Sequence, residues 1–379
     1  MKRLLTIGHS YVVAANRQLA HQMAVQGGDE WEVTVVAPRR FRGDLRQIEV
    51  EPIAGEKSTL RAVPVRLDRV PHLMWYGDGA REILASGWDV VHCWEEPYTR
   101  SAARIARAIP ARTKLVVASF QNIAKRYPWP LRAYERQTMK RANGWIAFGE
   151  TVHDTLKDRP GYADTPGRVI PPGVDLDRFH SDPHLRRAIR DRLGCPADAV
   201  VVGYLGRFVE AKGLDTLMQA VAAPLRDGRC HVLLVGGGEL ESRLRAFAAT
   251  HPGRVHVQTG VPHDEVPAWL NAMDILAAPT RSTPRWREQF GRMLIEAMAC
   301  GVAVAASDSG EIPVVIGDAG IVVGEDDVDG WQRAIGGLID DGAARQSYAR
   351  RGEARARERY GWALVARQHL AFFDEVLHA

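Results

Sequence analysis

No stretch of the 379-residue sequence approaches the roughly 20 consecutive apolar residues that a membrane-spanning helix requires. Near the N-terminus, Gly8, His9 and Ser10 interrupt the apolar residues before the core of a signal peptide can develop. We therefore predict that this segment forms a first β-strand. The expectation is a soluble protein that at most rests on a membrane surface.

Cysteine is scarce, and its four occurrences, Cys93, Cys195, Cys230 and Cys300, have no paired spacing. This pattern predicts buried free thiols in a reducing compartment, which favours the cytoplasm. It supports neither a disulfide framework nor a zinc site.

Low-complexity tracts and repeats of solenoid period are also missing. With 46% hydrophobic and 25% charged residues, the composition is that of a globular protein. Because 379 residues exceed what one hydrophobic core usually serves, two domains are predicted.

Charge is distributed unevenly between the two halves. Residues 1–170 carry 26 Lys and Arg against 18 Asp and Glu, a net +8, whereas residues 171–379 carry 24 against 28, a net −4. Two interpretations stay open for the basic half: an anionic acceptor or peripheral contact with the inner face of a membrane, or an ordinary solvated surface.

Short β-branched runs alternate with helical patterns along nearly the whole chain, which is typical of α/β domains with parallel sheets. Pro171, Pro172 and Gly173 interrupt the alternation and mark the domain boundary. We predict domains at 1–170 and 171–358, followed by a C-terminal helix at 359–379. The expected strands are 3–8, 31–37, 60–65, 89–93, 114–119 and 144–148, then 200–205, 231–235, 254–258, 275–278 and 302–307.

Ligands of open α/β sheets bind beyond the carboxyl ends of the strands. In the segment GRFVEAKG, Arg207 and Lys212 follow one such strand, five residues apart and next to a helix start. Two cations there suit a diphosphate. The alternative is a pair of exposed loop charges.

In the segment EQFGRMLIEAMACG, a helix is predicted from Arg292 to Cys300, with Glu288 in the loop before it and Glu296 on its second turn. Backbone N–H groups around Phe290, Gly291 and Arg292 would then form an anion site. Glu296 can hold two ribose hydroxyls, and Glu288 can reach the sugar. The alternative is an ordinary amphipathic helix.

Two further loops after strands carry weaker signals. The glycines around Gly237 permit close backbone approach, or simply a tight turn, and they lack the G-x-G-x-x-G spacing of a dinucleotide site. A nicotinamide-dependent oxidoreductase is therefore ranked last. Backbone groups of Gly260 and Val261 could hold a nucleobase, unless this loop is a plain connection.

Taken in order, these motifs resemble glycosyltransferase family 4, the retaining GT-B glycosyltransferases, over nearly the whole chain. The motifs are PPGVDLDRF at 171–179, GRFVEAKG at 206–213, TGV at 259–261, EQFGRMLIEAMACG at 288–301 and SDSGEIP at 307–313. The resemblance implies two facing Rossmann-like domains, with the donor site in the second and the terminal helix crossing back to the first.

What the resemblance implies for function is a hexosyltransferase that moves a sugar from a UDP- or GDP-linked donor to a glycan or lipid-linked acceptor, with retention of configuration. Arg207 and Lys212 would neutralise the diphosphate, Glu296 would hold the ribose, and Glu288 with the Phe290–Gly291 backbone would hold the sugar. Two alternatives stay open: a nucleotide-sugar epimerase on the same fold, and an inactive nucleotide-sugar-binding subunit. No nucleic acid partner is expected.

We expect no metal and no other cofactor. The Asp-x-Asp pattern of metal-dependent transferases occurs at Asp175 to Asp177 and at Asp327 to Asp329, but neither copy follows a strand that leads into the predicted site. The cations and the helix N-terminus would take the place of the metal.

The first half departs from the family pattern. Gly8 stands alone where many relatives have a glycine pair, and Gln121 stands where many have a histidine. Gln121, Gly8 and His9 are candidate substrate-binding residues, and His92, after another strand, is a candidate catalytic residue. For each histidine, the alternative is a satisfied side chain at a strand end.

A basic and aromatic segment lies at residues 125–141, KRYPWPLRAYERQTMKR. Its mixture suits an anionic headgroup or a lipid-linked acceptor. It is equally consistent with a basic surface helix that follows a proline-rich loop.

Overall fold

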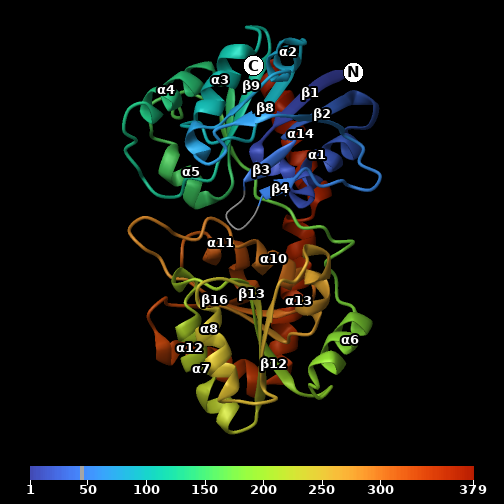
Figure 1. Ribbon diagram of the computed structural model, residues 1–379, viewed down its shortest axis with the longest axis vertical. Helices are drawn as coiled ribbons and strands as arrows, with labels where there is room; N and C mark the ends of the chain where they lie inside the picture. Colours follow the sequence, from blue (N-terminus) through green and yellow to red (C-terminus); the bar gives the residue numbers. More distant parts are fainter. Residues whose placement is uncertain (43–46) are drawn as a thin grey trace. The chain divides into compact units, whose positions relative to one another are not determined.

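The computed structural model describes residues 1–42 and 47–379 (Figure 1). Tertiary contacts divide the chain into two units, Met1–Gly173 with Trp362–Ala379, and Val174–Gly361. The chain thus leaves the first unit, builds the second, and returns.

The first unit is built on a parallel sheet with the strand order β11-β10-β9-β8-β1-β2-β5. Alternate residues of its strands enter two different cores, as Leu4 and Leu5 do, because successive side chains of a strand point to opposite faces. The strands are β1 (Lys2–Ile7), β2 (Trp31–Pro38), β5 (Thr59–Val63), β8 (Val90–Cys93), β9 (Lys114–Ser119), β10 (Gly144–Ala147) and β11 (Gly167–Val169).

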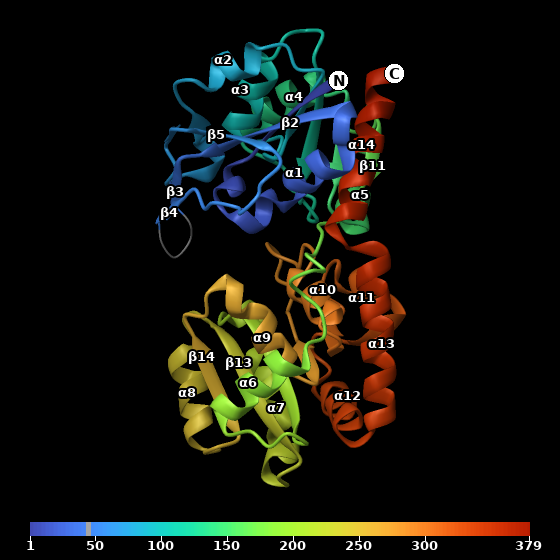
Figure 2. The same cartoon turned by 90° about the vertical axis from the view of Figure 1, so that its right-hand side faces the viewer.

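Helices cover both faces of this sheet, which explains why its strands are apolar on both sides. α1 (Ala14–Gly27) and α14 (Trp362–His378) pack side by side on one face (Figure 2). The other face carries α2 (Ala80–Ala85), α3 (Arg100–Ala108), α4 (Leu131–Arg141) and α5 (Glu150–Leu156).

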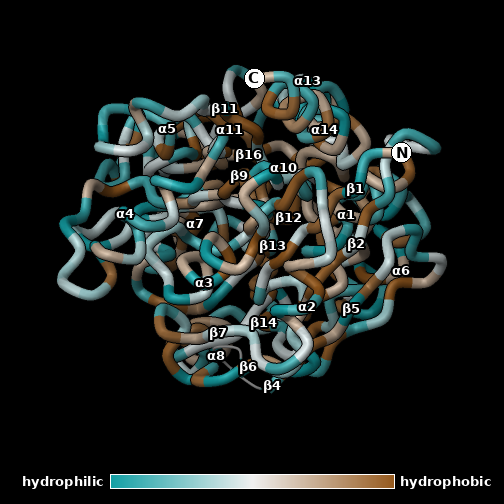
Figure 3. The backbone as a smooth tube through the Cα atoms, turned by 90° about the horizontal axis from the view of Figure 1, so that it is seen from above, coloured by the Kyte–Doolittle hydropathy of each residue, from teal (hydrophilic) through white to brown (hydrophobic). Residues whose placement is uncertain are grey.

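The second unit contains a parallel sheet with the order β14-β13-β12-β15-β16-β17. In Figure 3 the hydrophobic stretches follow central strands such as β12 and β13, whereas hydrophilic residues predominate on outer loops. The strands are β12 (Val200–Arg207), β13 (Cys230–Gly237), β14 (Val255–Thr259), β15 (Ile275–Ala278), β16 (Ala303–Ser307) and β17 (Gly320–Val323).

Two helical layers enclose the second sheet. α6 (Pro183–Leu193), α9 (Val266–Asn271), α10 (Arg292–Ala299), α11 (Ile312–Ile316) and α13 (Gly342–Arg359) contribute to the core on one face. α7 (Leu214–Arg226), α8 (Glu241–Ala249) and α12 (Val328–Asp340) contribute to the core on the other.

The predicted α/β class with two parallel sheets is confirmed, and each strand expected from the sequence is present with ends shifted by at most two residues. Missed were the edge strands β11 and β17 and two small hairpins, β3 (Arg40–Arg42) with β4 (Gln47–Glu49) and β6 (Val65–Arg66) with β7 (Trp75–Tyr76). The four cysteines are buried free thiols, as predicted. In the described part of the chain, no helix has the length and apolar character needed to cross a bilayer.

Packing of α14 on the first sheet gives a stability prediction. Phe373 is fully buried, with its ring 6.3 Å from that of Trp31 and 5.2 Å from that of His92. We expect Phe373→Ala to lower the free energy of unfolding by about 3–5 kcal/mol, because it leaves a cavity. Urea denaturation measures this, with Trp129→Ala as the control because Trp129 is 81% exposed. Equal transitions for the two variants would contradict the packing role.

Candidate active site

The carboxyl edge of the second sheet gathers the predicted donor-site residues of that unit. β12 ends at Arg207, β13 at Gly237 and β14 just before Gly260. The loops after β15 and β16 add Glu288 and the segment 308–311 to the same edge. Parallel strands bring these loops together because their carboxyl ends lie on one side.

A buried ion pair joins two of the predicted residues. Lys212, on the turn after β12, is 8% exposed, and its Nζ donates to the carboxylate of Glu288, which is equally buried. The Lys212 ammonium also lies 4.7 Å from the centre of the Trp286 ring. The reading of Lys212 as an exposed loop charge is therefore wrong. Removing one partner of a buried pair leaves the other charge uncompensated.

The loop after β16 fixes the backbone of Glu288. Its N–H points to the Ser309 hydroxyl at 3.4 Å, and its carbonyl accepts the Glu311 N–H at 3.1 Å. A Cβ at Gly310 would lie 2.1 Å from that carbonyl oxygen, and Gly310 has φ +55, so the position requires glycine. The sequence contains this signal in SDSGEIP, but reasoning from sequence assigned these residues no role.

Arg207 is exposed at the last position of β12. The hydroxyl of Tyr204 donates to the Arg207 carbonyl at 2.8 Å and so helps to fix the end of the strand. Burial, with the charge of Glu288, raises the pKa of Tyr204, which keeps this donor protonated. Tyr204 was not identified from sequence.

The start of α10 has the predicted geometry. Gly291 precedes the helix with φ +81, and Arg292 is its first residue. The Phe290 side chain is buried against Tyr360, with ring centres 5.7 Å apart, so only its backbone remains for a ligand. Backbone N–H groups of a first helical turn have no partner within the helix and favour anions.

Glu296 lies on the second turn of α10 and is 8% exposed. Within residues 1–42 and 47–379, no side chain or backbone group hydrogen-bonds its carboxylate. Burial raises the pKa of Glu296, although Arg292 and Arg178 act in the opposite direction. A buried carboxylate without a donor is unfavourable unless a ligand supplies one.

The glycine loop after β13 differs from the expectation. A Cβ at Gly237 would meet nothing within 4 Å, whereas Cβ atoms at Gly236 and Gly238 would lie 1.8 Å and 2.5 Å from the carbonyls of Gly206 and Phe208. The close backbone approach is therefore made to the end of β12 within the protein. After β14, a Cβ at Gly260 would likewise meet open space, and Val261 packs half-buried on the core.

In the first unit, the carboxyl edge carries a hydrogen-bonded group around Glu95. The backbone N–H and the ring Nδ1 of His9 both lie 2.7 Å from the Glu95 carboxylate, which also accepts the Tyr76 hydroxyl at 2.5 Å. Burial acts to lower the pKa of His9, but the charge and hydrogen bond of Glu95 outweigh it and raise this pKa. Gly8, just before His9, has no room for a side chain because a Cβ would lie 2.8 Å from that of Trp94.

Gln121 is 7% exposed and engaged within the protein. Its amide nitrogen donates to the Ile123 carbonyl at 2.6 Å, and its oxygen accepts the Tyr127 hydroxyl at 3.0 Å. Beside it, Glu96 accepts from the Ser119 hydroxyl at 2.8 Å and the Phe120 N–H at 2.7 Å.

The structure places His92, a candidate catalytic residue, inside a core and not at the ligand edge. Its ring is completely buried between the first sheet and α14, 5.5 Å from the ring of His369 and 5.2 Å from that of Phe373. Its Nδ1 lies 3.2 Å from the Thr6 hydroxyl. Burial, and secondly His369, depress its pKa well below the usual value, so the ring stays neutral. His92 is part of a core, because its side chain packs on the face of the sheet that α14 covers.

Both Asp-x-Asp copies have local structural roles. Asp175 accepts the backbone N–H groups of Asp177 and Arg178, and Asp327 caps α12 by accepting from Gly330. Among the described residues, no group of three or more His, Cys, Asp or Glu is arranged to hold a metal ion.

Glu96 provides a test of the first edge. Burial raises the pKa of Glu96 to about 7, against its hydrogen bonds, so this carboxyl destabilises the fold increasingly as pH rises from about 4.3 to about 7. We expect Glu96→Gln to remove this loss. Its stability relative to the wild type should therefore rise by about 1–3 kcal/mol between pH 5 and pH 8. Denaturation curves measure it, with Glu82→Gln on the exposed side of α2 as control, and parallel pH profiles would refute it.

The chain is similar in sequence to known glycosyltransferases along most of its length. A family model described as "Glycosyltransferase Family 4" matches residues 12–178, and one described as "Glycosyl transferases group 1" matches residues 199–341. The phosphatidyl-myo-inositol mannosyltransferase of Mycolicibacterium smegmatis is 33% identical over 91% of this chain and 86% of its own.

Two other similarities are narrower or more distant. A GDP-mannose-dependent alpha-(1-6)-phosphatidylinositol monomannoside mannosyltransferase of the same organism is 39% identical over 45% of this chain. The match covers 47% of that relative, about half of its length. The structure of Anabaena HepE in complex with UDP matches with a TM-score of 0.72 and 18% identity, covering 99% of this chain and all of its own, a likeness of fold.

The two family models together match most of the chain, and the Mycolicibacterium smegmatis mannosyltransferase that is 33% identical matches 91% of it. The chain belongs to the glycosyltransferases of family 4, with the GT-B fold.

Proposed function

We propose that this chain is a retaining hexosyltransferase that takes its sugar from a UDP- or GDP-linked donor bound at the carboxyl edge of the second sheet. The observation that carries the proposal is the buried Lys212–Glu288 pair, placed on the same edge as Arg207 and the start of α10. A relative named as GDP-mannose-dependent and a structural neighbour solved with UDP support this class of donor.

Each residue of the proposed donor site has a distinct part. Arg207 and the Lys212 ammonium face the diphosphate, and the N-terminus of α10 adds backbone donors. The Glu296 carboxylate, which no described residue hydrogen-bonds, accepts from the ribose hydroxyls. Glu288, with the backbone at Phe290 and Gly291, holds the sugar.

In the proposed reaction, the bond between the anomeric carbon and the β-phosphate oxygen breaks as the acceptor hydroxyl attacks the same face of the sugar. Negative charge develops on the β-phosphate and is stabilised by Arg207, Lys212 and the α10 N-terminus. The acceptor's proton passes to a β-phosphate oxygen. No residue needs to act as a covalent nucleophile, and no divalent metal is required in this scheme.

The acceptor is proposed to be a glycan or a lipid-linked molecule held by the first unit. His9 and Gln121 lie at that unit's carboxyl edge, where His9 is held by its bond to Glu95 and Gln121 by bonds to Ile123 and Tyr127. We propose that the His9 Nε2 and the second amide N–H of Gln121 bond to acceptor hydroxyls. The relatives named for phosphatidylinositol substrates support a lipid-linked acceptor. The proposed location is the cytoplasm, at the inner face of the membrane.

The donor site predicts a loss of turnover without loss of fold at Arg207. We expect Arg207→Gln to lower kcat by about 10² to 10³, because one charged donor to a developing anion is lost. The donor is first identified by thermal shift with UDP, GDP and their sugars, since a ligand at about 100 times its Kd stabilises by about 2.7 kcal/mol. Arg226→Gln, exposed at the far end of α7, is the matched control. Turnover of Arg207→Gln equal to this control would refute the diphosphate assignment.

The chemical scheme predicts retention without metal. We expect proton NMR of the first product to show the donor's anomeric configuration, at a rate that EDTA leaves unchanged, because the protein's own cations answer the diphosphate charge. An inverted anomeric coupling would exclude same-face attack. Loss of activity on chelation, restored by a divalent ion, would exclude a metal-free site.

A further inference from the structure

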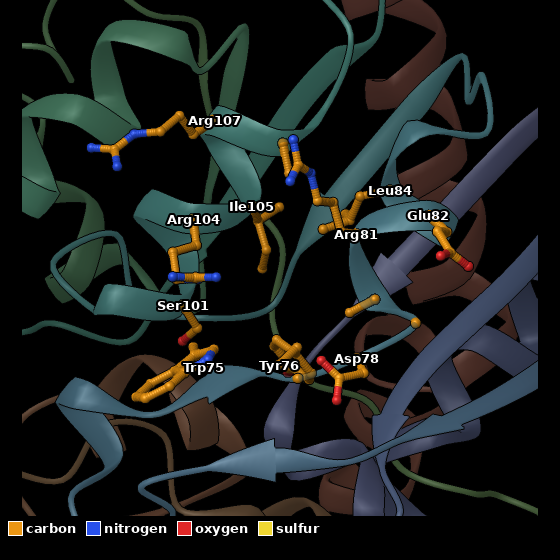
Figure 4. Close-up of a pocket in the computed structure, with 14 residues that line it drawn as sticks. Trp75, Tyr76, Asp78, Arg81, Glu82, Leu84, Ser101, Arg104, Ile105 and Arg107 are labelled. Atoms are coloured by element: carbon orange, nitrogen blue, oxygen red, sulfur yellow. The ribbon is translucent and has the colours of Figure 1, made fainter.

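Among the described residues of the first unit, two cavities have basic linings, and they differ in how many acidic residues and other partners accompany their cations. One, of about 600 Å³, lies between β7, α2 and α3 (Figure 4). Its Arg104 stacks on Trp75, its Arg107 bonds to Gln137, and Asp78 and Glu82 share the lining. Two acidic residues thus accompany the three arginines of this lining, and two of the arginines have partners within the protein.

The other cavity, of about 1030 Å³, lies between residues 124–129, α4 and residues 155–161. We call it the basic cavity. A single acidic residue, Glu135, accompanies its basic residues among the lining that the structure describes. The basic residues are Lys125, Arg126, Arg132, Arg136, Lys140 and Arg159.

Three of these cations form one face of α4. Arg132, Arg136 and Lys140 follow each other at intervals of four residues, which places them on the same side of the helix. All three are exposed, and no described residue forms an ion pair or hydrogen bond with their side chains. Like charges at this spacing repel, so an external anion would relieve the face.

Arg159 also has a donor atom that lacks a hydrogen-bond acceptor. Its guanidinium pairs with Glu135 at 3.3 Å and lies 5.6 Å from the centre of the Tyr127 ring. Its Nη1 is nevertheless buried with no hydrogen-bond partner among the described residues. An anionic oxygen at the cavity wall would satisfy this atom.

The basic cavity also has apolar surface at its opening. Trp129 lines it and is 81% exposed between two prolines, while Met139 lines it from the buried side. Tryptophan is enriched where headgroups meet acyl chains, because its ring is apolar with one polar N–H. Cations around an exposed tryptophan fit an anionic amphiphile better than a fully polar ligand.

We propose that the basic cavity binds the headgroup of an anionic phospholipid and docks the first unit on an anionic bilayer, with Trp129 entering the interface. The charge complementarity of the unpaired α4 face selects the anionic surface. Membrane binding by the basic cavity does not depend on the proposed function. Only its purpose, to bring a lipid-linked acceptor within reach of the enzyme, rests on that function.

Vesicle co-sedimentation without donor or acceptor tests the dock. The full chain should bind vesicles of phosphatidylcholine and phosphatidylglycerol in equal parts and leave phosphatidylcholine vesicles unbound. The triple change Arg132→Gln, Arg136→Gln, Lys140→Gln should weaken binding about 100-fold, since each cation near such a surface contributes a factor of about five. The matched control changes Arg81, Arg104 and Arg107 to Gln in the other cavity and should bind like the wild type.

Trp129 gives a second readout in the same samples. Brominated phospholipid should quench part of the wild-type fluorescence, and Trp129→Phe should lose that part because the other tryptophans stay in the protein. Equal weakening by both triple variants would overturn the cavity assignment. The absence of vesicle binding, with or without binding of nucleic acid, would overturn the proposal. Transfer to a water-soluble acceptor, measured separately, reports on the proposed function alone.

Discussion

The ion pair between Lys212 and Glu288 is the contact on which the geometry of the second unit's ligand edge depends. It ties the turn after β12 to the long loop after β15, which are also joined by a backbone hydrogen bond from Arg281 to Ala211. Removing two charges from water costs free energy that their mutual attraction often does not recover. The pair therefore fits a role in positioning the ligand edge better than a role in stability. Once Glu288 is fixed, the segment 308–311 closes over its backbone and α10 begins at Gly291.

The sequence predicted the strands of both sheets because buried parallel strands are short apolar runs that flanking helices separate. It also placed Glu296 on α10, since helix periodicity and the glycine before Arg292 set the register. The edge strands β11 and β17 escaped because they are short and partly exposed, so their composition resembles that of loops.

Side-chain direction was the main quantity that the sequence left open. His92 lies in β8, the strand that Glu95 and Glu96 follow, yet its side chain points into the core against α14 while the two acids lie at the edge. Lys212 looked like a loop cation because its partner Glu288 is 76 residues away. In both cases the deciding contact comes from a distant segment, which local patterns do not encode.

The return of α14 to the first unit has a consequence for synthesis on the ribosome. The second unit is one continuous stretch, Val174–Gly361, whereas the first needs α14, whose Asp374 reaches Lys2 of β1 at 2.5 Å. The face of the first sheet that α14 covers therefore stays open until the chain beyond Gly361 has emerged. A stop codon or a proteolytic cut before α14 would damage the unit that was made first and leave intact the one made last.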